Sequence, residues 1–276
     1  MFAVCSFCIG GLQGCSLFGE NEDNGGNAGL PEDVVNSYTP PEGKRVATFT
    51  TCYEDGTVRR DFSFQYDSYG RIKEVNFQSN IGGKNKETTY TFSYGSDYIA
   101  IFTEGSDGKQ YEQMRSYLDE DGKIIESTHN KSFDNITFEY DGIGRLTGGN
   151  DDDTPFQAKW SQGNLKSTEL FMSTTVGYGD ISNNTNFDFV AAITEAYYII
   201  EQSMMGEPLF GMFGFLGHRS DNLPASDKYC TWDSANSFRY EMDADGCPVK
   251  IICESGGGFN GSGEDMYHTL TYENQQ

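Results

Sequence analysis

The fold is decided by a pattern that is clearest in Phe62-Ser63-Phe64-Gln65-Tyr66-Asp67-Ser68-Tyr69-Gly70-Arg71-Ile72. Aromatic residues alternate with polar ones, and residues two apart on a strand face the same side of a sheet. An Asp-x-x-Gly turn follows, in which the Asp carboxylate can accept bonds from turn amides and the Gly can adopt a positive φ. The stretch therefore predicts a β-hairpin with one buried face.

The same alternation recurs along the chain, in Tyr90-Thr91-Phe92-Ser93-Tyr94 and in Ile136-Thr137-Phe138-Glu139-Tyr140. Turn-forming pairs separate these stretches: Asp55-Gly56, Gly82-Gly83, Asp107-Gly108 and Gly163-Asn164. Regularly spaced short strands of this kind indicate an antiparallel meander. We therefore expect a mainly β protein, a long antiparallel β-meander that forms a curved sheet or half-barrel around one amphipathic helix.

The Asp/Gly turn occurs four times. Its structural residues are Asp67, Gly70, Asp119, Gly122, Asp141, Gly144, Asp243 and Gly246. Asp-x-Asp-Gly also opens calcium loops, but the acid that such a loop needs at a later position does not follow. Turn geometry alone explains the spacing, so we expect no metal and no cofactor.

One segment has helical spacing. Residues 187–205 predict an amphipathic helix, which a glycine-rich apolar segment follows at 209–217. Helix and segment either fill the concave face of the sheet or cover a cavity for an apolar ligand. The candidate pocket residues are Phe189, Ile193, Tyr197, Ile200, Met204, Phe210, Phe213 and Phe215.

The N-terminus predicts an exported protein. Residues 1–15 are uncharged and end in Leu12-Gln13-Gly14-Cys15, which resembles a bacterial lipobox with Cys15 as the lipidated residue. The alternative is a buried first strand, and no Lys or Arg precedes the apolar stretch. Residues 16–44 are acidic and rich in Asn, Gly and Pro, which is typical of a flexible tether. Residues 45–276 then form a single β-rich domain.

Cysteine use leaves two possibilities open. Cys52, Cys230, Cys247 and Cys253 would remain after processing, and four cysteines allow three disulfide connectivities. Cys247 and Cys253 are expected on one strand, about 20 Å apart, which is too far for a disulfide between them. Free buried thiols are the alternative.

Charge and motifs limit the function classes. The net charge of -23 disfavours nucleic acid as a partner, because a phosphate backbone would be repelled. The three histidines lie in separate segments, and neither H-E-x-x-H nor G-x-S-x-G occurs. We therefore expect no enzyme but a binding or scaffolding domain for a glycan or protein. The alternatives are a lipid or apolar-ligand binding protein, and a hydrolase with an unrecognised pair of acids.

Three features carry a resemblance to a known family. They are the aromatic-Tyr-Asp-x-x-Gly-Arg hairpins, the stretch Leu216-Gly217-His218-Arg219-Ser220-Asp221-Asn222-Leu223-Pro224, and Phe238-Arg239-Tyr240-Glu241-Met242-Asp243-Ala244-Asp245-Gly246. From residue 46 onward the chain resembles Bacteroidetes lipoproteins with a domain of unknown function and a porin-like fold. The hairpins alone would also suit YD-repeat proteins. The resemblance implies a lipoprotein anchored to the outer membrane, periplasmic or surface-exposed, and brings no catalytic residues.

Overall fold

The computed structural model describes residues 34–81, 83–129, 135–169, 173–194, 196, 209–229, 235–255 and 266–273. They are mainly β-strand, with two short helices, α1 (Phe189–Ile193) and α3 (Leu209–Met212). The strands in chain order are β1 (Val46–Tyr53), β2 (Val58–Tyr66), β3 (Ile72–Ile81), β4 (Lys84–Tyr94), β5 (Tyr98–Glu104), β6 (Gln110–Leu118), β7 (Ile124–His129), β8 (Asn135–Tyr140), β9 (Leu146–Asp151), β10 (Thr154–Ser161), β11 (Asn164–Glu169), β12 (Ser173–Ser182), β13 (Asn222–Tyr229), β14 (Ala235–Met242), β15 (Pro248–Ser255) and β16 (Met266–Tyr272).

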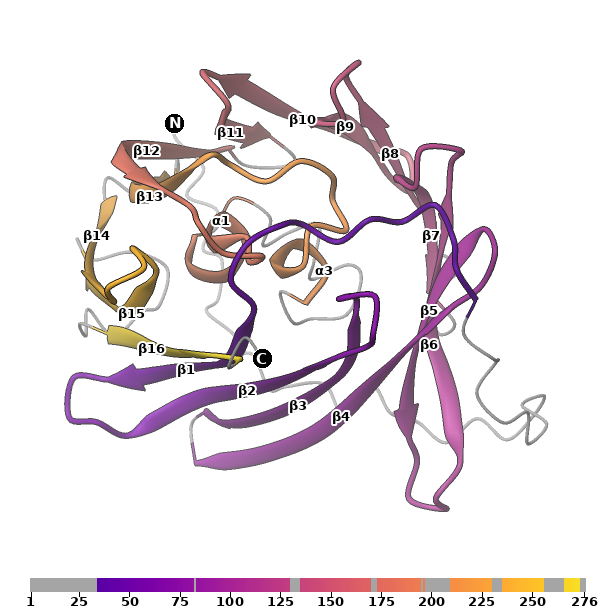
Figure 1. Cartoon of the computed structure of the whole chain (residues 1–276), viewed down its shortest axis with the longest axis horizontal. Coiled ribbons are helices and arrows are strands. Elements are labelled where there is room, and N and C mark those ends of the chain that lie inside the picture. The colour runs from indigo at the N-terminus through magenta and orange to yellow at the C-terminus, as the bar shows by residue number, and fades with distance from the viewer. Residues whose placement is uncertain are drawn as a thin grey trace, which may run out of the picture.

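The strands close into one antiparallel barrel in which each strand pairs with its neighbours in sequence (Figure 1). Closure occurs where β1 pairs with β16, from Val46 opposite Tyr272 to Tyr53 opposite Met266. The prediction of a mainly β antiparallel meander is confirmed, but the half-barrel is wrong. Alternation within each strand is a local signal, whereas closure depends on pairing between strands from opposite ends of the chain.

Alternation along each strand separates the inside of the barrel from the outside. Phe62 and Phe64 of β2 are 1% and 5% exposed and belong to the core. Gln65 faces outward and donates to Glu74 of β3. The aromatic stretches of β4 and β8 behave in the same way, which confirms these predicted strands. These three strands therefore turn an aromatic face inward and a polar face outward.

The connection between β12 and β13 enters the barrel. We call its described part the plug, residues 183–194 and 209–221, which contains α1 and α3 (Figure 1). The single helix expected over 187–205 is wrong, because α1 ends at Ile193 and Thr194 has an extended backbone. The Thr194 hydroxyl donates to the Val190 carbonyl, a local bond by which a β-branched residue competes with helix continuation. Phe189, Val190 and Ala191 are buried, and Ala192 and Ile193 are partly buried against the same core, so α1 is largely enclosed by the barrel.

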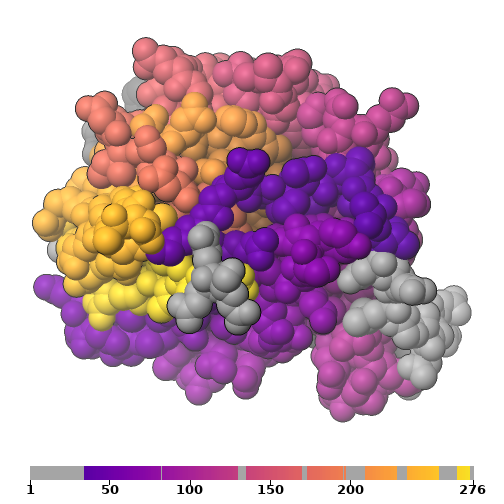
Figure 2. All heavy atoms as spheres, viewed as in Figure 1, coloured from indigo at the N-terminus to yellow at the C-terminus, as the bar shows by residue number. Residues whose placement is uncertain are grey.

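The barrel has two different ends. One end, which we call the strap end, carries the hairpins β2–β3, β6–β7, β8–β9 and β14–β15. A segment that we call the strap, residues 34–44, crosses this end in front of α1 and α3 (Figures 1 and 2). The strap was expected to be part of a flexible tether, but these residues lie against the barrel. The opposite end, the far end, carries the hairpins β1–β2, β3–β4 and β5–β6.

Three of the four cysteines in question lie in the described barrel. Cys52, Cys247 and Cys253 are buried, and Cys52 and Cys247 are free, which for these two agrees with the alternative of unpaired thiols. Cys230, like Cys15, lies outside the described residues.

Candidate functional site

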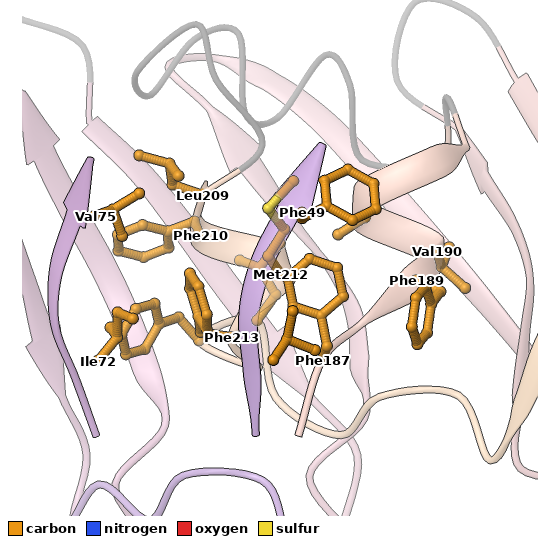
Figure 3. Packing of buried hydrophobic residues seen from close by; sticks show 14 of the residues in the cluster. Phe49, Ile72, Val75, Phe187, Phe189, Val190, Leu209, Phe210, Met212 and Phe213 are labelled. Carbon is orange, nitrogen blue, oxygen red and sulfur yellow. The ribbon is translucent and has the colours of Figure 1, made fainter. Parts of the chain in front are cut away.

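The expected apolar pocket is filled by its own side chains. Phe189, Phe210, Phe213 and Phe215 are at most 3% exposed, and Ile193 packs against the same cluster. Figure 3 shows the plug residues pointing toward Phe49 of β1 and toward Ile72 and Val75 of β3. Tyr197, Ile200 and Met204 lie outside the described residues. The described members of the candidate pocket therefore form core.

Ring contacts join the plug to the wall and the strap. The Phe187 ring centroid lies 5.4 Å from that of Phe49 and 5.9 Å from that of Phe64. The Phe215 ring lies 5.8 Å from Phe92 and 4.9 Å from Tyr38 of the strap. Aromatic pairs at such separations attract beyond the burial of their area. Plug, wall and strap thus share one aromatic core.

The four Asp/Gly turns lie at the strap end and use their carboxylates for turn geometry. In each copy the Asp Oδ1 accepts from the amides two and four residues later, as in Asp67 with Tyr69 and Arg71. The Gly of each copy has a φ between 73° and 84°. Bonds from the Arg145 amide lower the pKa of Asp141. These acids are therefore engaged as turn acceptors.

The strap is fastened by buried polar contacts. The Tyr38 hydroxyl donates to the Phe213 carbonyl at 2.9 Å. Arg71, which is 3% exposed, donates through Nη1 to the Val34 carbonyl and through Nε to Asp67. Lys44 Nζ lies 2.8 Å from Asp243 and 2.7 Å from Asp245. The strap end is closed by contacts that the local sequence pattern did not reveal.

The stretch Leu216–Pro224, the most specific of the resemblance motifs, connects four parts of the fold. The Ser220 hydroxyl accepts from the Leu165 amide of β11 and bonds to the Tyr178 hydroxyl of β12. Arg219 donates to the carbonyls of Asn183 in the plug and Glu42 in the strap. His218 contacts Asp221 at 3.3 Å and is partly exposed. Because the Ser220 hydroxyl is buried and already bonded, the stretch fits a structural junction and not a nucleophile.

One buried acid deserves comparison with the hydrolase alternative. Burial raises the pKa of Asp188 to about 6. Its Oδ1 caps α1 by accepting from the Val190 amide at 2.9 Å, and Arg219 is the charge that partly offsets the burial. A glycoside hydrolase needs a second carboxylate facing the first across a substrate site. Asp188 is instead an N-cap inside the core.

Two further features of the described part of the chain concern metal ligands and membrane-spanning helices. No group of three or more His, Cys, Asp and Glu side chains there could hold a metal ion. No described helix has the length and apolar character that crossing a membrane requires.

The outer face of β5 and β6 carries an aromatic surface that the sequence pattern did not reveal. We call it the tyrosine platform: Tyr98, Glu112, Arg115 and Tyr117. Tyr98 lies directly opposite Tyr117 in the sheet, and Tyr117 is 37% exposed. The Arg115 guanidinium lies 4.3 Å from the centre of the Tyr98 ring. The sequence pattern can indicate that each tyrosine faces outward. It does not show that Tyr98 and Tyr117 are neighbours, which follows only from the pairing register of β5 and β6.

Arg115 in the platform is held in place. Its Nε and Nη2 donate to the two carboxylate oxygens of Glu112 at 2.9 Å and 2.5 Å. This bond raises the pKa of Arg115. A bidentate pair fixes the plane of the guanidinium, which in turn holds the Tyr98 ring. The platform thus offers two phenol rings and two charged groups in a fixed arrangement.

Comparison with known proteins gives the fold a name. No protein-family model matches the chain, and no curated protein matches it. A crystal structure of a porin-like protein from Bacteroides uniformis resembles it with a TM-score of 0.57 and 16% identity, covering 83% of this chain and 98% of that one. The fold is porin-like. A porin-like protein from Bacteroides vulgatus has a TM-score of 0.34 and 14% identity, over 84% of this chain and all of that one. At these identities the likeness concerns the fold alone.

Proposed function

We propose that this porin-like barrel is a non-enzymatic binding domain of the bacterial cell envelope, and that the tyrosine platform binds glycans. The observation that carries the proposal is the pre-arranged pair Tyr98 and Tyr117 beside the Arg115–Glu112 ion pair. Sugar rings stack on aromatic side chains, while their hydroxyls bond to fixed charged groups. A protein surface is the alternative ligand.

The packing of the plug inside the barrel favours a function on the outer surface over a function as a channel. A porin channel needs a water-filled lumen, whereas the plug packs Phe187, Phe213 and Phe215 against the inner wall. The outward side chains are polar and pair with one another, as Gln78 does with Glu87 and Lys159 with Glu169. A barrel braced from inside in this way acts as a rigid support for groups on its outside.

Binding is tested with an array of bacterial and host glycans, probed with the wild-type protein and with Tyr117→Ala. We expect Tyr117→Ala to lose at least tenfold in affinity for the glycan that wild type binds best. Tyr111→Ala is the matched control, because Tyr111 is 40% exposed on the same strand but lies outside the platform. Equal losses in both variants, or no glycan bound by wild type, would contradict the proposal.

The location is a separate proposal. We infer from the lipobox-like Leu12-Gln13-Gly14-Cys15 that lipid on Cys15 holds the domain at the outer membrane. Expression in a Bacteroides host with a radioactive fatty acid should label wild type and leave Cys15→Ser unlabelled. Label retained in Cys15→Ser would refute the anchor without affecting the platform.

A further inference from the structure

A row of polar residues crosses five neighbouring strands near the far end of the barrel. The pairing register places them side by side in the order His268 (β16), Thr51 (β1), Arg60 (β2), Ser79 (β3) and Lys86 (β4). We call this set the polar row. Residues that lie opposite one another in a sheet present their side chains to the same face. The polar row is therefore one continuous strip on the barrel wall.

The strip faces inward. Phe62 is two residues from Arg60 and Phe77 is two residues from Ser79, and both rings are 1% exposed in the core. The His268 ring stacks on Phe49 at 5.1 Å, and Lys86 Nζ lies 5.4 Å from the centre of the Phe77 ring. The polar row thus lies directly above an aromatic layer.

Access changes along the strip. His268 and Thr51 are buried, and the Thr51 hydroxyl bonds to His268 Nδ1 at 3.0 Å. Arg60 and Ser79 are half-buried, and Lys86 is exposed. A ligand would therefore approach from Lys86 and meet Arg60 next.

Arg60 differs from five of the seven other arginines in its partners. Arg45, Arg71, Arg115, Arg145 and Arg239 each pair with an Asp or Glu. No carboxylate in the described ranges lies within 4.0 Å of Arg60, and its Nε is buried without a hydrogen-bond partner. The chain holds 42 acidic residues against 19 basic ones, so acids are abundant. A partly desolvated guanidinium without an acceptor is unfavourable, and an incoming anion removes that cost.

We propose that the polar row binds an anion, the carboxylate or phosphate group of a ligand, with Arg60 as its main donor. A guanidinium can donate two parallel bonds to either group. Arg60 and Lys86 lie two strands apart, about 10 Å between their backbones, so both side chains can reach one anion. Ser79 lies between them and can add a hydroxyl donor. The buried His268 and Thr51 close the inner end of the site.

This site is independent of the tyrosine platform, which lies on the outer face of other strands. A second, acidic ligand class is therefore assigned to the barrel interior. The repulsion expected from a net charge of -23 makes a local basic site more selective, because only an anion that fits between Arg60 and Lys86 gains enough to approach.

The experiment measures thermal unfolding and calorimetric binding of the full chain with inorganic phosphate, glucuronate and neutral glucose. We expect saturable stabilisation by phosphate or glucuronate, none by glucose, and at least a tenfold loss of affinity in Arg60→Gln. Lys86→Gln should lose a smaller factor. Arg239→Gln is the control, because Arg239 is exposed on β14 and already paired with Glu254. The comparison of phosphate with glucuronate separates a phosphorylated ligand from an acidic sugar.

Stability without ligand distinguishes a binding role of Arg60 from a structural one. If Arg60 is kept for a ligand, Arg60→Gln should unfold at the same temperature as wild type or higher, because an unpaired charge has been removed. An unfolded or clearly destabilised Arg60→Gln would overturn the proposal. So would anion effects that are equal in wild type, Arg60→Gln and Arg239→Gln. Neither outcome depends on glycan binding at Tyr117.

Discussion

The two ends of the barrel use the same turn for different purposes. At the strap end Asp119 accepts from the Lys123 amide, and Gly122 lies so close to the strap that an added Cβ would be 2.2 Å from the Ser37 carbonyl oxygen. At the far end the turn between β5 and β6 repeats the backbone bonds, with Gly105 in the place of Asp119. Its Gly108 has nothing within 4 Å of an added Cβ. The two turns therefore share their backbone geometry. They differ in that the Gly122 turn lies against the strap, whereas Gly108 has open space beside it.

Charge pairing follows the same division. At the strap end Lys44, Arg71 and Arg145 are each held by an Asp of the repeated turns. At the far end the described residues provide no such partner for Arg60, whose Nε has no hydrogen-bond acceptor. At the closed strap end, acidic and basic side chains therefore pair with each other. At the far end, the Arg60 guanidinium stays available for a ligand. Four predictions test this difference.

The largest effect should come from Tyr38→Ala in the strap. Tyr38 is 8% exposed, and the substitution removes a ring that packs on Phe215 at 4.9 Å. We expect a loss of about 3–5 kcal/mol in the free energy of unfolding by urea. Tyr38→Phe, which removes only the bond to Phe213, should lose about 0.5–1.5 kcal/mol. A loss below about 1 kcal/mol for Tyr38→Ala would mean that the strap is not part of the core.

The turns provide a matched pair of variants. Gly122→Ala and Gly108→Ala both place a side chain at positive φ, +79° and +75°, which costs about 1–2 kcal/mol in each. Only the added methyl group of Gly122→Ala also meets the strap backbone. We therefore expect this variant to lose about 1–3 kcal/mol more in the free energy of unfolding than Gly108→Ala. Chemical denaturation of both variants measures the difference. Equal losses would show that the strap does not bear on this turn.

Two buried titratable groups should give opposite pH slopes. The pKa of Asp188 in the plug is raised to about 6 by burial, so its stabilisation is present below about pH 4 and is lost as the pH rises through 6. The pKa of His268 in the polar row is lowered to about 3 by burial and by Arg60 and Arg59. Its stabilisation is therefore present above about pH 6.5 and is lost as the pH falls toward 3.

Asp188→Asn keeps the cap oxygen and should remove the first slope, while His268→Gln should remove the second. Unfolding free energies measured from pH 4 to pH 7 should change by on the order of 1–3 kcal/mol relative to wild type, with opposite signs for the two variants. Parallel profiles for both variants would show that neither group titrates differently in the folded and unfolded states.

The smallest effect concerns Lys44, whose Nζ contacts Asp243 and Asp245 at the surface of the strap end. Bonding to Lys44 lowers the pKa of Asp243. Exposed ion pairs are weak and screened by salt. Lys44→Gln should therefore lower the melting temperature slightly at low salt and have no effect at 1 M salt. An unchanged loss at high salt would point instead to the contact of Lys44 Nζ with the Tyr272 ring, whose centre lies 5.1 Å away.

Comparison of the two ends also shows where sequence reasoning worked. The alternation of Phe62, Phe64 and Tyr66 identified a strand and its buried face, because a period of two is a direct consequence of strand geometry. The Asp67–Gly70 spacing identified a turn for the same local reason. The stripe from Phe189 to Met204 predicted one helix, but α1 ends at Ile193, where the extended Thr194 bonds back to the Val190 carbonyl.

Neither candidate site could be found in this way. Tyr98 and Tyr117 are 19 residues apart in the chain, and only the register between β5 and β6 brings them together. The polar row joins residues as distant as Thr51 and His268. The 42 acidic residues of the sequence offered no way to single out a catalytic or binding pair. The anion site was indicated by Arg60, whose buried Nε has no hydrogen-bond partner among the described residues.

The sequence by itself determined many of the strands, the turns between them and which face of the aromatic strands is buried. Each of these follows from backbone geometry and side-chain type within a few residues. Only the tertiary structure decided that β1 meets β16, that the strap covers one end, and that Arg60 at the other end has a buried Nε with no hydrogen-bond partner among the described residues. These outcomes depend on contacts between residues far apart in the chain, whose free energies are settled by packing in the whole barrel.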